Sequence, residues 1–216
     1  MIVTLRARAV LLDMDGTLVD STAVVERLWL DWARPHGLEP ERVFSVVHGR
    51  QGHQSMAILL PERDHAINLV ENAQMLAREA GDVDGVVAIP GAAELLTALS
   101  GHPHAIVTSA DVALMTARMD AAGLPLPDVR ITAESVSASK PHPEGFLAGA
   151  AALGLEPIDC VVFEDSEAGI QAGLAAGMRV VGVGPHAAAP HPTFAVPDLT
   201  HVRVSASDDG LNITLD

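Results

Sequence analysis

The stretch AVLLDMDGTLVDS, residues 9–21, passes from an apolar strand directly into two aspartates and a glycine. Asp-Gly is a common turn pair, so a hairpin turn at Asp15 and Gly16 is the simplest interpretation. A hairpin needs a second strand after the glycine, whereas residues 18–29 have the pattern of a helix entry, with Asp20 or Ser21 as its cap. The strand end therefore presents its carboxylates to something other than a hairpin.

A calcium-binding EF-hand loop is the second alternative for these carboxylates. Such a loop needs glycine at its sixth position and glutamate at its twelfth. Counted from Asp13, the glycine is fourth and the twelfth residue is Val24. The spacing excludes this loop and leaves a reaction centre at the end of a buried strand.

The composition predicts a chain with a sizeable core and an acidic surface. About half of the 216 residues are hydrophobic and 19% are charged, so disorder is not expected. Acidic residues outnumber basic ones by 28 to 13, which gives a formal charge of −15. Since this charge repels phosphate backbones, we expect no nucleic-acid partner. A small phosphorylated ligand remains compatible, because a metal ion or a few cations can dominate locally.

Cysteine usage and hydropathy restrict the class of protein further. Cys160 is the single cysteine, which excludes an intramolecular disulfide and a thiolate metal cluster. The first residues lack the pattern of a secretory signal, and no stretch approaches the roughly 20 apolar residues of a membrane span. We expect a cytoplasmic monomer with no membrane partner.

Strand-like and helix-like segments alternate in the second half of the chain. The expected strands, apolar and rich in β-branched residues, are 104–109, 129–133, 160–165 and 179–184, after a first strand at 7–13. The expected helices, each ending near a glycine, are 111–123, 143–154 and 166–177. This alternation predicts an α/β fold with a Rossmann-like parallel sheet.

The region between the first two strands breaks this alternation. Residues 20–86 contain only helical patterns, at 21–37, 39–49, 53–60 and 62–81. We therefore predict a core formed by 1–19 and 87–216, with an inserted small helical cap domain at 20–86. Residues 82–91 are the expected return linker, and 196–216 has a weak hairpin pattern with Asp-Gly at its turn.

Polar residues follow the predicted parallel strands where each one ends. Since ligands bind outside the carboxyl ends of such strands, these residues should meet at one rim of the sheet. They are Asp13, Asp15, Thr108, Ser109, Glu164 and Asp165, together with Lys140 ahead of a helix. Hard oxygen ligands of this kind suit Mg²⁺. Lys140 is the single lysine among thirteen basic residues, and its compact ammonium suits contact with a phosphoryl oxygen or a carboxylate.

Four motifs in order resemble the signature of the haloacid dehalogenase (HAD) superfamily. They are DMDGT (13–17), IVTS (106–109), SKPHPEGF (139–146) and VVFEDSEAG (161–169). The helical insertion resembles the cap of the β-phosphoglucomutase-like branch. The segments at 25–38, 46–51, 86–92 and 119–125 are similar to bacterial sugar phosphatases and to glycerol-3-phosphate and 2-deoxyglucose-6-phosphate phosphatases.

The resemblance implies a Mg²⁺-dependent phosphatase for small sugar or polyol phosphates. It implies that Asp13 is the nucleophile that forms an aspartyl-phosphate and that Asp15 is the acid/base. The metal would be held by Asp13, by the backbone carbonyl of Asp15 and by Asp165, with Glu164 a ligand or the neighbour of one. Thr108, Ser109 and Lys140 would hold the phosphoryl group.

The cap should determine which substrate is accepted. Its expected substrate residues are His48, Arg50, Gln51 and Glu26, although a solvated helix surface also explains Arg50 and Glu26.

Other functions within and beyond the superfamily fit these residues less well. Dehalogenases lack the second aspartate, and phosphonatases need a cap lysine that this sequence does not have. The main alternative is a β-phosphoglucomutase-like sugar phosphomutase, whose cap also uses a lysine. A non-catalytic phosphosugar-binding module would have no need of Asp15.

Overall fold

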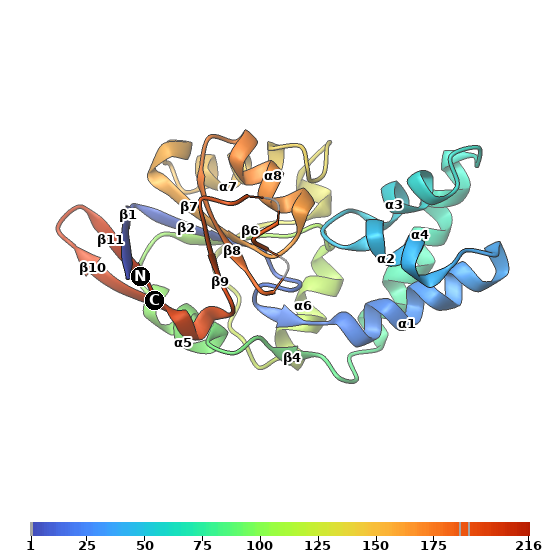
Figure 1. Ribbon diagram of the computed structural model, residues 1–216, viewed down its shortest axis with the longest axis horizontal. Coiled ribbons are helices and arrows are strands. Elements are labelled where there is room, and N and C mark those ends of the chain that lie inside the picture. Colours follow the sequence, from blue (N-terminus) through green and yellow to red (C-terminus); the bar gives the residue numbers. More distant parts are fainter. Residues whose placement is uncertain (1, 186, 190) are drawn as a thin grey trace.

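The computed structural model describes residues 2–185, 187–189 and 191–216, and its centre is a six-stranded parallel sheet (Figure 1). The strand order is β6-β5-β2-β7-β8-β9. These strands are β2 (Ala9–Leu12), β5 (His104–Val107), β6 (Val129–Ile131), β7 (Cys160–Glu164), β8 (Arg179–Val183) and β9 (Phe194–Val196). The predicted Rossmann-like α/β fold is confirmed. Of its strands, β9 had no counterpart in the sequence prediction.

Helices cover both faces of this sheet. One face packs against α5 (Ala92–Leu99) and α6 (Val112–Ala121), and the other against α7 (Glu144–Ala152) and α8 (Glu167–Ala175). Successive residues of a strand point to opposite faces, so Leu12 belongs to the first layer and Leu11 to the second. Both leucines are fully buried, which explains the continuous apolar runs in the sequence.

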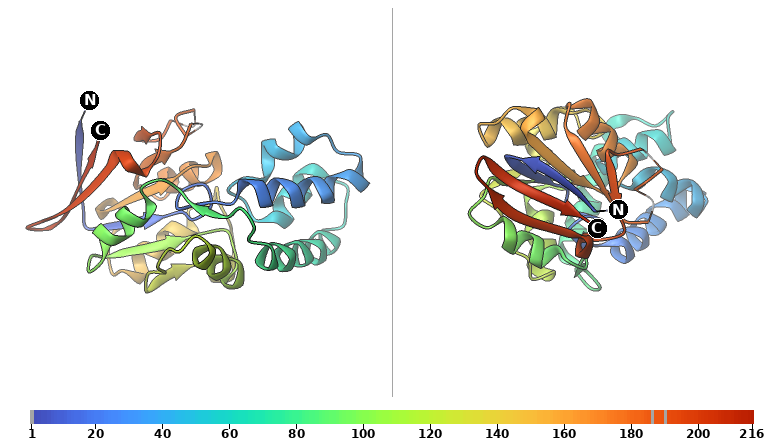
Figure 2. Two further views of the ribbon diagram at one scale, coloured as in Figure 1. Left: turned by 90° about the horizontal axis from the view of Figure 1, so that it is seen from below. Right: turned by 60° about the vertical axis from the view of Figure 1, so that its left-hand side comes forward.

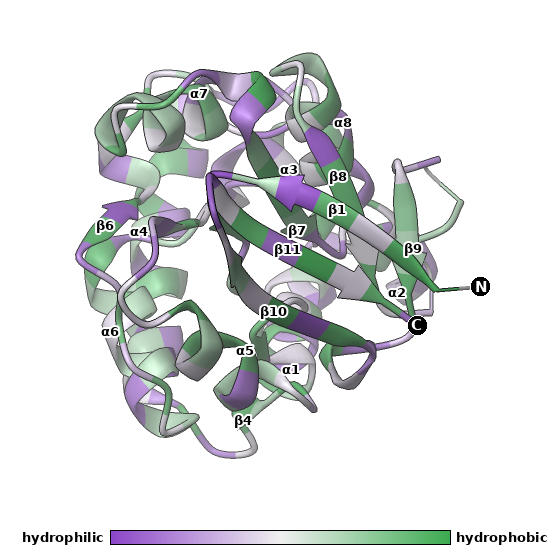
Figure 3. Ribbon diagram, turned by 90° about the vertical axis from the view of Figure 1, so that its left-hand side faces the viewer, coloured by the Kyte–Doolittle hydropathy of each residue, from purple (hydrophilic) through white to green (hydrophobic). Residues whose placement is uncertain are grey.

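The strand predicted at 7–13 is present as β2, and a further strand that was not predicted precedes it. The chain forms β1 (Val3–Ala7) and then, after Arg8, the separate strand β2. β1 pairs antiparallel with β11 (Gly210–Leu215), which also pairs with β10 (Val202–Ser207). This three-stranded sheet lies at the end of the molecule that carries both termini, and its strands mix hydrophobic and hydrophilic residues (Figure 3). The predicted tail hairpin is thus confirmed, with an unpredicted third strand beside it.

Four α-helices separate β2 from α5 in the sequence. They are α1 (Thr22–Ala33), α2 (Pro40–Val47), α3 (Gly52–Leu59) and α4 (His65–Gly81), and we call them the helical cap. The chain enters through β3 (Val19–Asp20) and returns through β4 (Val87–Ala88), and these two short strands pair antiparallel. Figure 2 shows the helical cap as a group of helices beyond one end of the sheet. The division at residues 19/20 and 86/87 stays a prediction.

Short 3₁₀ helices complete the architecture. They are η1 (Arg34–His36), η2 (Ala133–Ser135), η3 (Pro157–Asp159) and η4 (Leu199–His201). In the part of the chain that the structure describes, no helix is both long and apolar enough to cross a membrane.

Candidate active site

The carboxyl ends of the two central strands bring three acidic residues together. Asp13 directly follows β2, Glu164 ends β7, and Asp165 comes next in the chain. β2 and β7 are adjacent parallel strands in register from Ala9 and Cys160, so their ends lie at the same rim of the sheet. One carboxylate oxygen from each of the three acids lies within 4.8 Å of the others.

Lys140 is the cation of this cluster. Its ammonium donates hydrogen bonds to Asp13 Oδ1 and, at 2.7 Å, to Glu164 Oε1. The lysine lies in the loop before α7, and 6% of it is exposed. A buried ammonium needs charged partners, and these two carboxylates supply them.

Glu164 accepts hydrogen bonds from the protein through both of its carboxylate oxygens. Its second oxygen accepts from the backbone N–H of Ser166 at 2.6 Å and from the Ser166 hydroxyl at 2.9 Å. A Cβ atom at Gly169 would overlap the carboxylate, so only glycine fits where α8 crosses this side chain. These contacts make Glu164 a support for Lys140, and its role as a metal ligand or the neighbour of one stays a prediction.

Asp165 stands where the chain leaving β2 turns. Gly16 adopts φ +85°, and a Cβ atom there would overlap the Asp165 carboxylate. The Thr17 hydroxyl also approaches Asp165 Oδ1 at 3.4 Å. The glycine of the opening motif therefore serves the turn and also lets the carboxylate of another strand approach the backbone.

The charges of this cluster do not cancel. When all three carboxyl groups are ionised, they face one ammonium, which leaves two negative charges in a largely buried site. Burial raises the pKa of Asp13 to about 8, although Lys140 opposes this shift, and burial also raises the pKa of Asp165. A divalent cation would balance the two charges, and carboxylate oxygens are the ligands that Mg²⁺ prefers. The residues present thus fit a magnesium ion between Asp13 and Asp165.

The loop after β5 supplies hydroxyl and amide groups to the same rim. Thr108 Oγ1 accepts from the backbone N–H of Ala110 at 3.0 Å, which shapes a tight turn. The Ser109 hydroxyl donates to the carbonyl of Gly49 in the helical cap at 3.2 Å. Both residues line the cavity in front of Asp13.

Asp15 is contacted through one oxygen by a hydrogen bond and an ion pair. Its Oδ1 atom accepts from the Ser21 hydroxyl at 2.8 Å and lies 2.7 Å from Nη1 of Arg118. Ser21 is the residue before α1, and its hydroxyl makes no cap hydrogen bond there because Asp15 receives it. Of the two expected caps, Asp20 and Ser21, the structure has Ser21 at the N-cap position, while the Asp20 side chain accepts the hydrogen bond from the Thr22 N–H.

Arg118 and Glu79 were not predicted from the sequence. Arg118 comes from α6 and donates to Glu79 of α4 at 2.9 Å, with 3% and 6% of the two residues exposed. Burial raises the pKa of Glu79 to about 7, although Arg118 opposes this shift. An ion pair between residues 39 positions apart leaves no periodic trace, so only the packing of α4 against α6 shows it.

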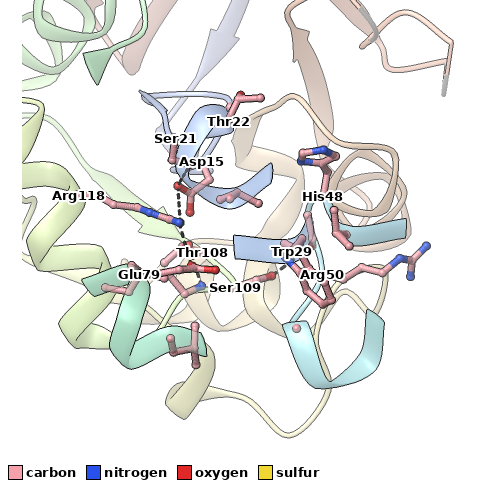
Figure 4. Close-up of a pocket in the computed structure, with 18 of the residues that line it drawn as sticks. Asp15, Ser21, Thr22, Trp29, His48, Arg50, Glu79, Thr108, Ser109 and Arg118 are labelled. Atoms are coloured by element: carbon pink, nitrogen blue, oxygen red, sulfur yellow. Dashed lines mark hydrogen bonds and ion pairs between the residues drawn. The ribbon is translucent and has the colours of Figure 1, made fainter. Parts of the chain in front are cut away.

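A cavity of about 120 Å³ separates the sheet rim from the helical cap. Asp13, Asp15 and Asp165 line it from the rim, and Trp29, Asn72 and Glu79 from the cap. Figure 4 shows Asp15, Ser21, Arg118 and Glu79 gathered on one side, with His48 and Arg50 on the other.

The predicted cap residues are distributed unequally around this cavity. His48 and Arg50 line it, but the Arg50 guanidinium points away from Asp15 in Figure 4. Gln51 lines a separate space of about 20 Å³ beside Lys140. Glu26 is half-buried on α1 and is not among the lining residues. The roles of these four residues stay predictions.

Comparison with known proteins gives a consistent family. The family model for haloacid dehalogenase-like hydrolases matches residues 7–177. Hexitol phosphatase A of Escherichia coli K12 is 45% identical over 188 residues, which cover 86% of this chain and 87% of that protein. Glycerol-1-phosphate phosphohydrolase 1 of Saccharomyces cerevisiae is 32% identical, covering 83% of this chain and 76% of that protein.

A solved structure agrees in three dimensions. A hydrolase from Pseudomonas syringae superimposes with a TM-score of 0.76 at 26% identity, covering 89% of this chain and 94% of that one.

Proposed function

Because this chain belongs to the haloacid dehalogenase-like hydrolase family, we propose that it is a Mg²⁺-dependent phosphatase that works through an aspartyl-phosphate on Asp13. The chain is a phosphoric monoester hydrolase, as its relatives are. The observation that carries the mechanism is the placement of Lys140 between Asp13 and Glu164, next to Asp165 at the cavity floor. This arrangement pairs one carboxylate oxygen of Asp13 and leaves the other for chemistry.

The proposed substrates are small sugar or polyol phosphates, with hexitol phosphates foremost. The relative with 45% identity is named a hexitol phosphatase, and the yeast relative is named for glycerol 1-phosphate. The cavity suits a polyol chain, because Asn72 and His48 provide polar groups beside the apolar surfaces of Trp29 and Met75.

Asp13 is the proposed nucleophile. Its free carboxylate oxygen attacks phosphorus, the bond from phosphorus to the substrate oxygen breaks, and the phosphoryl group is left on Asp13. A carboxylate and a phosphate repel each other, so Lys140 must reduce this repulsion from its position on the other oxygen. Thr108 and Ser109 lie on the cavity wall where they can hold phosphoryl oxygens.

Asp15 is the proposed acid and base. It gives a proton to the departing alcohol oxygen and then takes one from the water that hydrolyses the aspartyl-phosphate. Asp15 is two residues beyond the nucleophile and lines the same cavity, which suits both transfers.

Asp13 and Asp165, with the backbone carbonyl of Asp15, are the residues that would hold Mg²⁺. When bound, the ion supplies positive charge that stabilises the phosphoryl oxygens as the transferred group leaves the substrate. Glu164 contributes by holding Lys140 and the turn at Ser166.

Phosphate release from a substrate panel tests this proposal. Purified protein with Mg²⁺ should release inorganic phosphate from hexitol and glycerol phosphates, and EDTA should stop the release. Isomerised sugar phosphate with negligible free phosphate would indicate the mutase instead. Saturable binding without turnover of any substrate would indicate a binding module.

A further inference from the structure

Arg118 connects the acid/base of the core with the helical cap. Its Nη1 atom lies 2.7 Å from Asp15 Oδ1, and its Nη2 atom lies 2.9 Å from Glu79 Oε2. Asp15 belongs to the loop after β2, Arg118 to α6, and Glu79 to α4 of the helical cap. One guanidinium therefore bridges a carboxylate of the core and a carboxylate of the helical cap, on the same side of the cavity (Figure 4).

The geometry at Asp15 separates the two oxygens of the carboxylate. Ser21 and Arg118 both contact Oδ1. Within residues 2–185, 187–189 and 191–216, no side chain donates a hydrogen bond to Oδ2. The carboxylate is thereby fixed in rotation about its own bond, with the second oxygen available for a proton that goes to the substrate.

The buried position of the guanidinium also lowers the stability of the folded state. Arg118 Nε is buried and has no hydrogen-bond partner among the described residues. A buried donor without a partner destabilises the folded state, so packing alone gives no reason for an arginine here. The two ion pairs explain the arginine, since a planar guanidinium holds two carboxylates at a fixed angle.

We propose that Arg118 is a positioning residue that aims Asp15 at the leaving-group oxygen, and that Glu79 makes this alignment depend on the helical cap. Arg118 touches no reacting atom and acts through the orientation of Asp15. When α4 lies against α6, Glu79 occupies one arm of the guanidinium and the other arm faces Asp15. This inference rests on the proposed phosphatase function.

The leaving group provides a readout that a merely structural role would not move. An alkyl phosphate loses an alkoxide that must receive a proton, whereas acetyl phosphate loses acetate, which needs none. The kcat/KM value covers the steps up to formation of the aspartyl-phosphate, so the later use of Asp15 as a base does not enter it. The ratio of kcat/KM for sorbitol 6-phosphate to kcat/KM for acetyl phosphate thus reports proton delivery by Asp15.

The test compares this ratio in wild-type protein and three variants. Arg118→Lys keeps the charge but replaces the planar fork with a shorter side chain that ends in a point charge. Glu79→Gln keeps the shape but removes the charged cap partner. Arg78→Lys is the matched control, because Arg78 is an arginine of α4 that pairs with Asp31 at the surface. Thermal unfolding identifies any variant that fails to fold. If Arg118→Lys fails to fold, the comparison of Glu79→Gln with the wild type is the test.

We expect the ratio to fall by about 10-fold or more in Arg118→Lys, since general acid catalysis contributes roughly 10²- to 10⁴-fold. A smaller fall of the same sign is expected in Glu79→Gln, and no change in Arg78→Lys. If kcat/KM falls equally on both substrates, or does not fall, in a folded variant, the inference is overturned and the proposed function is not. Wild-type protein that releases phosphate from neither substrate would overturn the proposed function and this inference with it.

Discussion

Lys140 donates a hydrogen bond to the Asp13 carboxylate across 127 positions of sequence. The same ammonium holds Glu164, so the single lysine of the chain is the cation of a buried acidic cluster. Two strands and the loop before α7 meet at this contact. The reactive end of β2 and the stability of the sheet rim therefore depend on one side chain.

Removal of this ammonium should destabilise the fold and stop catalysis. Lys140→Met leaves the Asp13 and Glu164 carboxylates buried without a cation, which costs about 3–5 kcal/mol. Urea unfolding without divalent cations measures the loss. Arg78→Met removes an exposed ion pair and should cost at most about 1 kcal/mol. A similar small cost for both variants would contradict the role of Lys140.

Magnesium should stabilise the folded protein through Asp165. Binding to the folded state alone adds about 2.7 kcal/mol at a concentration 100 times Kd, so the thermal midpoint should rise as Mg²⁺ is added. Asp165→Asn should remove most of this rise. Glu167→Gln is the control, because Glu167 is an exposed acid two residues further on and faces Gln171. A rise that persists in Asp165→Asn would place the ion elsewhere.

Glu79 should make stability depend on pH. Burial raises its pKa from 4.5 to about 7, so the folded protein keeps a proton that the unfolded chain has lost between these values. The stability contributed by this group is present below pH 4.5 and falls as the pH rises through 7. Glu79→Gln cannot ionise, so its free energy of unfolding should increase relative to that of the wild type by about 2–3 kcal/mol over this interval.

Urea unfolding from about pH 5 to about pH 8 checks this difference. Glu71→Gln is the matched control on the same helix, because its ion pair with Arg63 lowers the pKa of Glu71 and moves its titration below the interval. The difference between Glu71→Gln and the wild type should stay constant. A constant difference for Glu79→Gln as well would contradict the raised pKa of Glu79.

Gly49 should control how closely the helical cap approaches the core. Gly49 and Gly37 both have positive φ, +74° and +64°, so alanine costs about 1–2 kcal/mol of strain at either. A Cβ atom at Gly49 would also overlap Ser166, whereas nothing lies within 4 Å at Gly37. We expect kcat/KM for sorbitol 6-phosphate to fall roughly 10-fold in Gly49→Ala and little in Gly37→Ala, since small misplacements are costly in catalysis. Equal kcat/KM values in the two variants would show that this contact does not matter.

Sequence patterns predicted the parallel sheet because its buried strands are continuous apolar runs. They failed where pairing depends on distant segments. β1 pairs with β11 at the other end of the chain, so residues 3–6 were not predicted as a strand. The short strand β9 and helix α5 were missed, and each is shorter than nine residues.

The site shows the same limit. Asp13, Thr108, Lys140 and Asp165 could be placed because each follows a strand or precedes a helix in a recognisable motif. Arg118 could not, since a lone arginine within a helix gives no sign that it is buried against carboxylates from two other elements.

The most direct test of the account is a rapid acid quench with radiolabelled sorbitol 6-phosphate and Mg²⁺. Wild-type protein should carry labelled phosphate during turnover and release it as inorganic phosphate. Asp13→Asn should carry no label and release no phosphate, because the attacking carboxylate oxygen is lost. Phosphate release by folded Asp13→Asn at the wild-type rate would contradict the account.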